Sequence, residues 1–403
     1  MTNDSRSAHK FVAAHVDNLP KSGIRDFFDI VAGRKDVISL GIGEPDFKTP
    51  WHIRAKTVEC IENGFTRYTS NLGMPELRRE LANYMHNSFQ TDYDWESEIL
   101  VTVGVSEAMD IALRAIIRPG DEVLYHEPAF VAYAPLISMA HGVPVAVETF
   151  REDEFRITIE ELEKKVTSQT RALLLNFPNN PTGATLRPPD VEDLADFAIR
   201  HDIILISDEV YMELTYDERR KSLASVQRIK DRLILLNGFS KAWSMTGFRL
   251  GFVCAPAPLT DAMMKIHQFS IMCASSISQV AGLEALRNGN SEVIKMRNSY
   301  KLRRNFMVAS LNELGLDCFM PQGAFYVFPS IKSTGLSSHD FAMNLLKEHD
   351  VACIPGTAFG TCGEGYLRCA YATGMDKLKE AIKRIEIFIK TKAACSRNQT
   401  KLL

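Results

Sequence analysis

The sequence predicts an α/β protein in which a mostly parallel sheet, flanked by helices, is followed by a smaller α+β domain. Between about residues 99 and 236, short apolar runs alternate with longer helical patterns, which is typical of βαβ units with buried strands. Beyond about residue 281 the alternation stops, and long helical patterns surround a strand of alternating polarity. On these two grounds we expect a large domain and a smaller one.

Composition and charge narrow the class of protein. The chain has 403 residues, 45% hydrophobic and 24% charged, as expected of a globular enzyme, and its net charge of −3 argues against nucleic acid and membrane partners. No apolar run approaches the roughly 18 residues of a membrane span. The eight cysteines form no CxxC pair and the ten histidines no HxxxH pattern, so we expect reduced thiols, no metal site and a cytoplasmic location.

The N-terminal region contains a glycine turn. The elements expected before it are a polar arm (1–20), a helix (22–34) and a strand (37–40). Gly41 and Gly43 resemble part of a dinucleotide loop, but the third glycine is missing and Pro45 interrupts the start of a helix. A plain nucleotide-binding protein is therefore disfavoured, and the glycines predict a turn that lets the backbone approach a ligand.

The central region predicts a sheet with a site along one edge. The strands expected are 99–103, 123–125, 143–147, 171–175, 203–206 and 233–236, and the helices are 53–63, 75–86, 107–117, 131–139, 158–166 and 191–201. The residues within a few positions of a strand's carboxyl end are Gly104, Phe130, Asn180, Asp208 and Lys241. Ligands bind at that edge of parallel sheets, so these residues are expected to converge on one site.

Lys241 is the centre of the predicted chemistry. A lysine directly after a buried strand loses its proton more easily than a surface lysine, and the neutral amine can attack an aldehyde. Ser240 beside it and Arg249 a short loop away suit a phosphate, and the turn from Gly104 to Ser106 offers backbone amides to an anion. The pattern points to a lysine that forms a Schiff base with pyridoxal 5'-phosphate (PLP).

The C-terminal region predicts the smaller domain. We expect helices at 291–314, 338–349 and 376–390, and a strand at 323–329. The domain boundaries expected are an N-terminal arm with part of the small domain (1–48), a large cofactor-binding domain (49–285), a small C-terminal domain (286–392) and a flexible tail (393–403).

These landmarks resemble the class I/II aminotransferases among the fold-type-I PLP enzymes. The motifs are Gly43-Glu-Pro-Asp-Phe, Tyr68, Asn180-Pro-Thr-Gly, Asp208-x-x-Tyr211, Ser240-Lys241, Arg249 and Arg368, in the family's order and over about 37–384. The segments IGEPDF, SDEVYxELTYD and HQFSIMCASSISQ are most similar to those of the bacterial subgroup of aspartate, aromatic and N-acetyl-diaminopimelate aminotransferases. The resemblance implies a large domain with a seven-stranded-type sheet, and a homodimer with shared active sites.

The resemblance also implies catalytic roles. Lys241 would hold the cofactor and act as general base, and Asp208 would pair with the pyridine nitrogen; the alternative for Asp208 is a helix N-cap. Asn180 and Tyr211 would donate to the ring's 3′ oxygen, and Phe130 would stack on the ring. The alternatives for these three are a turn asparagine, a core tyrosine and a core phenylalanine.

Binding roles follow in the same way. Val105, Ser106, Ser240 and Arg249 would bind the phosphate, which Tyr68 would reach from the other subunit. Gly238 stands where the family has the first serine of its SxSK pattern, which removes one phosphate donor.

The substrate is expected to bind through its α-carboxylate. Arg368 would hold that group beside Gly43 and Asn180, because a guanidinium in an apolar strand is costly unless it meets an anion. An internal salt bridge is the alternative for Arg368.

The function expected is a ping-pong transfer of an amino group from an L-amino acid to a 2-oxo acid of the 2-oxoglutarate type. A PLP-dependent carbon–sulfur lyase on the same scaffold is the alternative. A PLP sensor is disfavoured, because about 35 residues before the first strand leave little room for a DNA-binding module. The side-chain specificity does not follow from the sequence.

Overall fold

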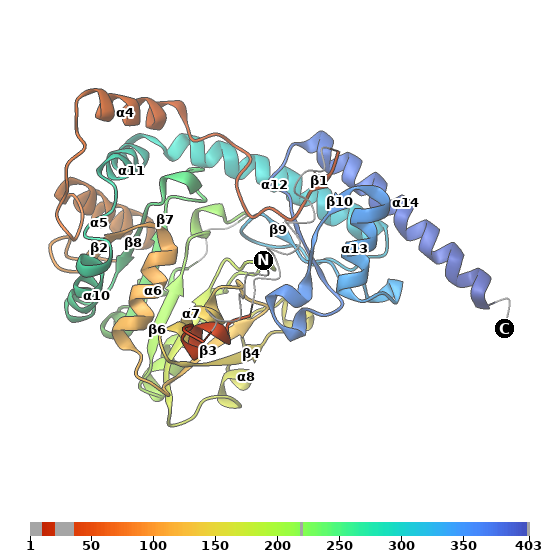
Figure 1. Cartoon of the computed structure of the whole chain (residues 1–403), viewed down its shortest axis with the longest axis horizontal. Helices are drawn as coiled ribbons and strands as arrows, with labels where there is room; N and C mark the ends of the chain where they lie inside the picture. Colours follow the sequence, from red (N-terminus) through yellow and green to blue (C-terminus); the bar gives the residue numbers. More distant parts are fainter. Residues whose placement is uncertain (1–9, 21–35, 218–220, 401–403) are drawn as a thin grey trace, which may run out of the picture.

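The computed structural model describes residues 10–20, 36–217 and 221–400, and shows a large domain built on a central sheet with a smaller domain beside it (Figure 1). The helix expected at 22–34 lies outside the described residues. The arm contains one short helix, α2 (Ala14–Asp17), which the sequence did not predict.

The central sheet has seven strands, and six of them run in the same direction. Its order is β2 (Ile99–Thr102), β8 (Gly251–Cys254), β7 (Leu233–Gly238), β6 (Ile204–Asp208), β5 (Thr170–Asn176), β3 (Glu122–Glu127) and β4 (Val143–Glu148). The expected mostly parallel sheet is confirmed. Strand β8 was not predicted; it pairs antiparallel with both β2 and β7, because a loop too short for a helical crossover returns the chain beside β7.

Apolar residues cover both faces of this sheet, as the strand patterns predict. Leu174, Ile206 and Ile234 face one cluster, whereas Leu173, Leu205 and Leu235 face the other. The helices of the large domain are α4 (Trp51–Glu62), α5 (Pro75–Phe89), α6 (Gly104–Ile116), α7 (Tyr133–Met139), α8 (Ile159–Glu163), α9 (Pro188–Arg200), α10 (Ala257–Ser270) and α11 (Ser276–Asn288). Their packing leaves the carboxyl edge of the strands open toward the small domain.

The small domain combines the short strand at residues 38–39 with the C-terminal part of the chain. Its elements are β1 (Ile38–Ser39), α12 (Asn290–Glu313), β9 (Tyr326–Val327), α13 (Ser338–His349), β10 (Val351–Ala352), β11 (Ile354–Pro355), β12 (Leu367–Ala370) and α14 (Met375–Thr400). Strand β1 pairs in parallel with β10, and β12 lies between β11 and β9 in an antiparallel sheet. The strand expected at 323–329 is shorter than predicted.

The last helix extends into the segment that was expected to be a flexible tail. Helix α14 continues through residues 393–400, since no glycine or proline interrupts the helical pattern after Met375. Short 3₁₀ helices of one or two turns occur in the connections at Arg151–Asp153, Met212–Leu214, Leu223–Ser225, Gln227–Arg232, Thr246–Phe248, Lys332–Thr334, Gly356–Phe359 and Thr361–Gly363.

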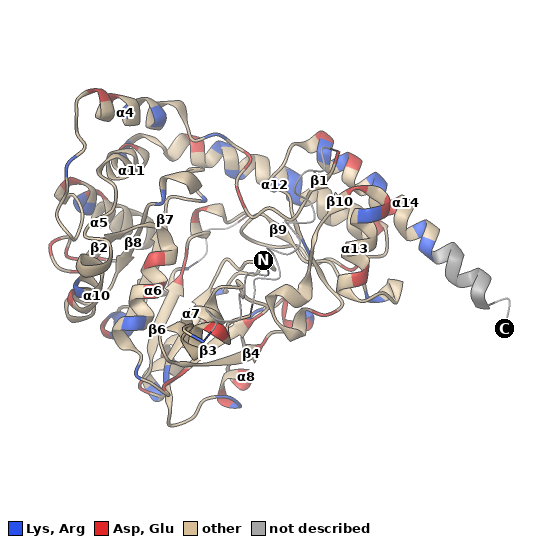
Figure 2. Ribbon diagram, viewed as in Figure 1, with Lys and Arg blue, Asp and Glu red and all other residues tan. Residues whose placement is uncertain are grey.

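Charged side chains of both signs are interspersed over the helices and loops, whereas the strands of the central sheet are almost free of them (Figure 2). Within the described ranges, no helix is both long and apolar enough to cross a membrane. The same part of the chain has no group of three or more histidine, cysteine or acidic residues placed to hold a metal ion.

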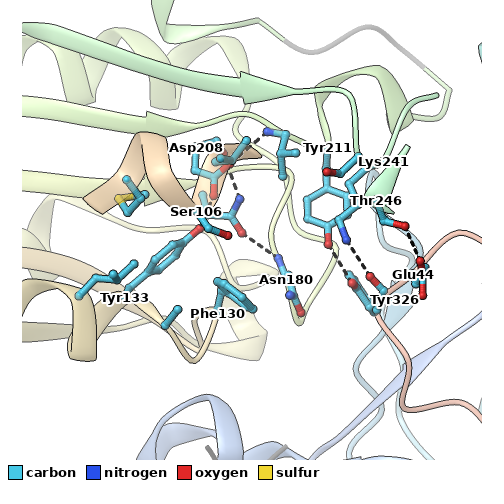
Figure 3. Close-up of a pocket in the computed structure, with 18 of the residues that line it drawn as sticks. Glu44, Ser106, Phe130, Tyr133, Asn180, Asp208, Tyr211, Lys241, Thr246 and Tyr326 are labelled. Atoms are coloured by element: carbon cyan, nitrogen blue, oxygen red, sulfur yellow. Dashed lines mark hydrogen bonds between the residues drawn. The ribbon is translucent and has the colours of Figure 1, made fainter. Parts of the chain in front are cut away.

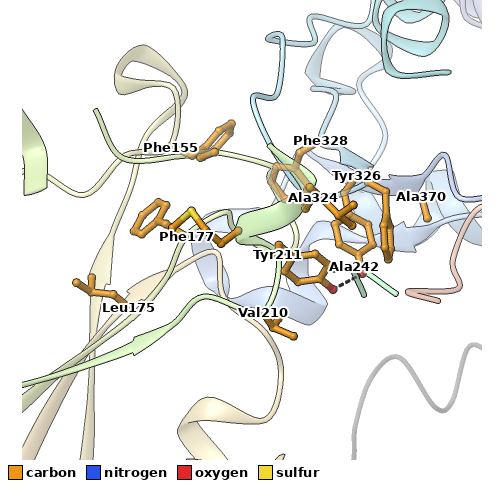
Figure 4. Packing of buried hydrophobic residues seen from close by; sticks show 14 of the residues in the cluster. Phe155, Leu175, Phe177, Val210, Tyr211, Ala242, Ala324, Tyr326, Phe328 and Ala370 are labelled. Atoms are coloured by element: carbon orange, nitrogen blue, oxygen red, sulfur yellow. Dashed lines mark hydrogen bonds between the residues drawn. The ribbon is translucent and has the colours of Figure 1, made fainter. Parts of the chain in front are cut away.

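Aromatic packing joins the two domains next to the open sheet edge. Phe155 of the large domain contacts Phe328 edge-to-face, with ring centres 5.5 Å apart, and Tyr211 packs against Tyr326 in the same way at 5.9 Å (Figure 4). These rings belong to one continuous core. The small domain is thereby held against the carboxyl ends of the strands.

Candidate active site

A cavity of about 560 Å³ lies at the carboxyl edge of the central sheet, in the size range of ligand pockets (Figure 3). All of the predicted site residues except Tyr68 line it: Gly43, Val105, Ser106, Phe130, Asn180, Asp208, Tyr211, Ser240, Lys241, Arg249 and Arg368. Most of them follow the ends of strands in the central sheet, whereas Arg249 precedes β8, and Gly43 and Arg368 come from the small domain. The fold therefore brings together residues that are up to 325 positions apart (Gly43 to Arg368).

Lys241 lies three residues beyond the end of β7, with its amine in the cavity. Its Nζ donates to the carbonyl of Gly43 at 2.7 Å and lies 5.7 Å from the centre of the Tyr211 ring. Burial first, and the charge of Arg368 second, lower the pKa of Lys241 to about 8. About a tenth of the amine is then neutral at pH 7, far more than for an ordinary lysine, and this form can attack an aldehyde or accept a proton.

Asp208 is the last residue of β6 and is buried. Its Oδ2 accepts a hydrogen bond from the Tyr133 hydroxyl at 2.7 Å, and its Oδ1 accepts one from the backbone N–H of Val210 at 3.2 Å. Burial raises the pKa of Asp208 to about 6, and the bond from Tyr133 opposes that rise. Each carboxylate oxygen keeps a second lone pair, so a protonated ring nitrogen in the cavity would find an acceptor.

Arg368 lies in β12 with a side chain that is only 2% exposed. Its Nη1 donates to Asn180 Oδ1 at 2.9 Å and its Nη2 to the carbonyl of Gly41 at 2.5 Å. The guanidinium also lies 4.8 Å from the ring centres of both Tyr326 and Phe359. No acidic residue of the described chain is paired with it, and its Nε has no partner there. The salt-bridge alternative is not observed.

Two asparagines connect these residues. Asn176, at the end of β5, donates from Nδ2 to the backbone carbonyl of Asp208 at 3.0 Å and accepts from the backbone N–H of Asn180 at 3.0 Å. The side-chain oxygen of Asn180 accepts from Arg368. Asn180 therefore does more than form a turn, and its amide group remains beside the cavity.

A pair of tyrosines lies near Lys241. The hydroxyls of Tyr211 and Tyr326 are 2.8 Å apart, and burial raises the pKa of Tyr211 well above its usual value, which keeps its proton in place. Gly43 approaches this pair closely, because a Cβ atom there would lie 2.7 Å from the Tyr326 oxygen. Phe130 is 37% exposed at the cavity, with its ring edge-to-face to Tyr133, and is not a core residue.

The start of α6 forms an anion cradle. The helix begins at Gly104 without a side-chain cap, so the amides of Val105 and Ser106 lack helical partners. Gly104 has φ +73°, and a Cβ there would lie 2.9 Å from Nη2 of Arg249. A Cβ at Gly251 would lie 2.8 Å from the nitrogen of Val105. Both glycines are thus needed for the close approach of the arginine and the strand to the helix start.

The hydroxyl of Ser240 lines the same cavity. At Gly238, a Cβ would lie 3.0 Å from both the Leu250 carbonyl oxygen and a methyl group of Val105. Little room is therefore left for the serine that the family pattern has there. Tyr68 is 81% exposed in the connection between α4 and α5 and does not line the cavity of its own chain.

The sequence reasoning missed several lining residues: Glu44, Met109, Ala132, Tyr133, Leu136, Asn176, Val210, Thr246 and Tyr326. The strand-end rule would have found Asn176, which closes β5. Tyr133 and Leu136 are three residues apart on α7, a spacing that is equally typical of residues that pack in the core. Tyr326 and Thr246 carry no comparable signal.

A buried amine, a buried carboxylate, an aromatic side chain and an anion cradle around one cavity define the site of a fold-type-I PLP enzyme. The chain belongs to the aminotransferase class I and II family, whose sequence profile matches residues 35–385. The residues present fit the cofactor, since the Gly104 cradle suits its phosphate and the free lone pairs of Asp208 suit its ring nitrogen. The protein is therefore a PLP-dependent aminotransferase.

Comparisons with known proteins agree with this conclusion. The chain is 47% identical to an aspartate aminotransferase of Pyrococcus abyssi, over 94% of this chain and 98% of that one. It is 45% identical to aromatic-amino-acid aminotransferase 2 of Thermococcus litoralis, over 92% and 96%. The crystal structure of an aromatic aminotransferase from Pyrococcus horikoshii superposes with a TM-score of 0.87 at 45% identity, covering 92% of this chain and 99% of that chain. Nothing in these comparisons supports the lyase alternative.

Proposed function

We propose that Lys241, Asp208 and Arg368 carry the amino transfer of this enzyme. In this assignment Lys241 holds the cofactor and moves the substrate proton, Asp208 pairs with the ring nitrogen, and Arg368 binds the substrate α-carboxylate. The unpaired Nε of Arg368 is the observation that carries the proposal. A buried guanidinium without an anionic partner is costly, so an anion in the cavity would stabilise it.

When bound, PLP supplies an aldehyde that condenses with amines and a ring that takes up the electron pair released at the substrate Cα. With the cofactor bound, the neutral Nζ of Lys241 would carry the proton between the substrate Cα and the cofactor's aldehyde carbon, for which a pKa of about 8 is well matched. Arg368 fixes the carboxylate and thereby orients the Cα–H bond toward that amine. Asn180 and Tyr211 donate hydrogen bonds beside the ring.

In this assignment an L-amino acid and a 2-oxo acid such as 2-oxoglutarate use the same cavity in turn, because both present a carboxylate to Arg368, and the exchange is therefore a ping-pong reaction. The phosphate is assigned to Val105, Ser106, Ser240 and Arg249, because these residues form the cradle at the start of α6.

Substitution of Arg368 by lysine tests the carboxylate role. The charge remains but the two-pronged geometry is lost, so kcat/KM for amino acids is expected to fall by roughly two to three decades, whereas amines without a carboxylate lose little further. Arg304→Lys is the matched control: Arg304 is also buried, but it is paired with Asp217 and does not line the cavity. Equal losses for amines and amino acids would show that Arg368 is a structural residue.

We also propose that the enzyme is a homodimer whose sites are completed in trans. Exposed apolar side chains gather on α4 and on the segments beside it: Trp51 (69%), Val58 (51%), Ile61 (53%), Phe65 (45%), Tyr68 (81%), Phe269 (88%) and Met272 (45%). Asn71 ties two of these segments together, donating to the carbonyl of Met272 at 2.6 Å. A second copy that covered this surface would remove the apolar area from water and present Tyr68 to its partner's phosphate site.

Mixing two inactive variants tests the shared site. Lys241→Ala chains and chains disrupted at Tyr68 should form heterodimers in which one site is intact, and up to about a quarter of the activity should return under random exchange. Light scattering that finds an active monomer would contradict the dimer. The described cysteines are free thiols, which supports the further proposal of a reducing, cytoplasmic compartment.

A further inference from the structure

We propose that Tyr133 is a positioning residue, whose phenol keeps the Asp208 carboxylate ionised and oriented for the ring nitrogen of the cofactor. The inference rests on the role proposed for Asp208 and adds a residue from α7, an element that contributes none of the groups assigned above. Figure 3 shows Tyr133 reaching across the cavity wall with its hydroxyl directed at Asp208.

The geometry makes Tyr133 the side chain that determines the state of this carboxylate. Its hydroxyl donates to Oδ2 at 2.7 Å, and both residues are buried, Tyr133 being 2% and Asp208 6% exposed. The other donor is the backbone N–H of Val210, at the longer distance of 3.2 Å. No second side chain of the described residues donates a hydrogen bond to this carboxylate.

Charge and packing around the pair favour the same role. Burial raises the pKa of Asp208, whereas the Tyr133 bond and the positive charge of Lys241 lower it. Glu209 and Tyr211, the other titratable groups nearby, interact with Asp208 only through charge. Burial raises the pKa of Tyr133 well above its usual value, so the phenol stays a donor, and its ring rests edge-to-face against Phe130.

Loss of the phenol would make the carboxylate a stronger base. A hydrogen bond to a charged group stabilises the ionised form by an amount equivalent to about one to two pH units. Without it, the proton shared between Asp208 and the ring nitrogen would move toward the carboxylate. The ring would then be a weaker acceptor of the electron pair, although Asp208 itself is unchanged.

The chain offers a matched control in Tyr125. This buried tyrosine of β3 donates to Oε1 of Glu127, also at 2.7 Å, but neither residue lines the cavity. Tyr125→Phe therefore removes a tyrosine–carboxylate bond of the same length from the same domain without touching Asp208.

The first measurement uses the holoenzyme loaded with PLP that carries ¹⁵N in the ring. The ¹⁵N chemical shift should report a protonated nitrogen in the wild type and in Tyr125→Phe, and a largely deprotonated one in Asp208→Asn. In Tyr133→Phe the shift should move part of the way toward the deprotonated value. A protonated nitrogen in Asp208→Asn would overturn the role of Asp208, whereas a wild-type shift in Tyr133→Phe alone would overturn only the inference on Tyr133.

The second measurement needs no cofactor. Because the folded pKa of Asp208, about 6, exceeds that of an unfolded aspartate, its contribution to stability is lost as pH rises from about 4 to 6. In Tyr133→Phe, the pH range over which the unfolding free energy falls should extend about one pH unit or more higher. This extension should vanish in an Asp208→Asn background. An extension that persists in that background would overturn the proposal. If Tyr133→Phe does not fold, fluorotyrosine can be placed at position 133. Because it is a stronger hydrogen-bond donor, the pH range over which the stability falls should become shorter, and an unchanged range would contradict the inference.

Discussion

The end of β6 places two acidic residues side by side with opposite surroundings. Asp208 faces the cavity, where a tyrosine and a backbone amide bind it. Glu209 lies on the other side of the strand, away from the cavity, and accepts hydrogen bonds from Ser207 Oγ at 3.0 Å and the Leu223 N–H at 3.3 Å. Burial raises the pKa of both carboxyls, to about 6 and about 7.

Asp208 and Glu209 differ in their access to a ligand and not in whether burial raises their pKa values. A pKa shift alone would select Glu209 before Asp208, yet Glu209 has no contact with the cavity. The buried arginines show the same contrast: Arg304 is paired with Asp217, whereas Arg368 has no acidic partner among the described residues and lines the cavity. A functional residue here is a buried charged group that faces the cavity.

The largest expected effect separates two lysines. Lys241→Ala removes the covalent and proton-transferring group and should lower kcat by about three decades or more, while PLP still binds through its phosphate. Lys230→Ala, away from the cavity, removes an ion pair with Glu98 and a hydrogen bond to the carbonyl of Asp92, both 2.9 Å long, and should leave kcat within about twofold. Borohydride reduction followed by peptide mapping should place the pyridoxyl group on Lys241; a label on another lysine would refute the assignment.

The next effect separates the two carboxyls. Asp208→Asn should lower turnover on the order of a hundredfold or more, because the ring nitrogen loses its charged partner. Glu209→Gln keeps size and hydrogen bonds and should leave turnover within about fivefold. Steady-state kinetics at saturating PLP distinguish the two, and similar losses in both variants would mean that the open side of Asp208 is not what matters.

The smallest effect concerns stability and pH. The folded pKa of Glu209, about 7, is higher than that of an unfolded glutamate, so its stabilising contribution is present below about pH 4.5 and is lost as pH rises to 7. In Glu209→Gln, the unfolding free energy should therefore fall less over this pH range than in the wild type, by on the order of 2–3 kcal/mol. Urea titrations of the apoprotein at pH 5 and pH 8 measure this effect. If the difference in unfolding free energy between the two pH values were the same as in the wild type, a group other than Glu209 would be responsible for it.

The strands and the residues after them could be predicted from sequence because both depend on local pattern. A buried parallel strand needs a continuous apolar run, and polar residues such as Asp208 and Lys241 mark where each run stops. The parallel direction then places every carboxyl end on one edge. The convergence of the strand-end residues on one cavity follows from these rules, and the family resemblance added Arg368 and Tyr211 to the predicted site.

Tertiary structure decided the remainder. Antiparallel β8 depends on the strands that the chain pairs with. The hydroxyl of Tyr133 reaches Asp208 across 75 positions, and that of Tyr326 reaches Tyr211 across 115. Sequence alone determined which residues follow the buried strands, since an apolar run and the polar residue that ends it are local features, and the alternation of strands and helices implied the parallel direction that puts them on one edge. Which buried groups find partners was decided by the packing of helices and domains, because a hydrogen bond requires a distance that no periodicity encodes.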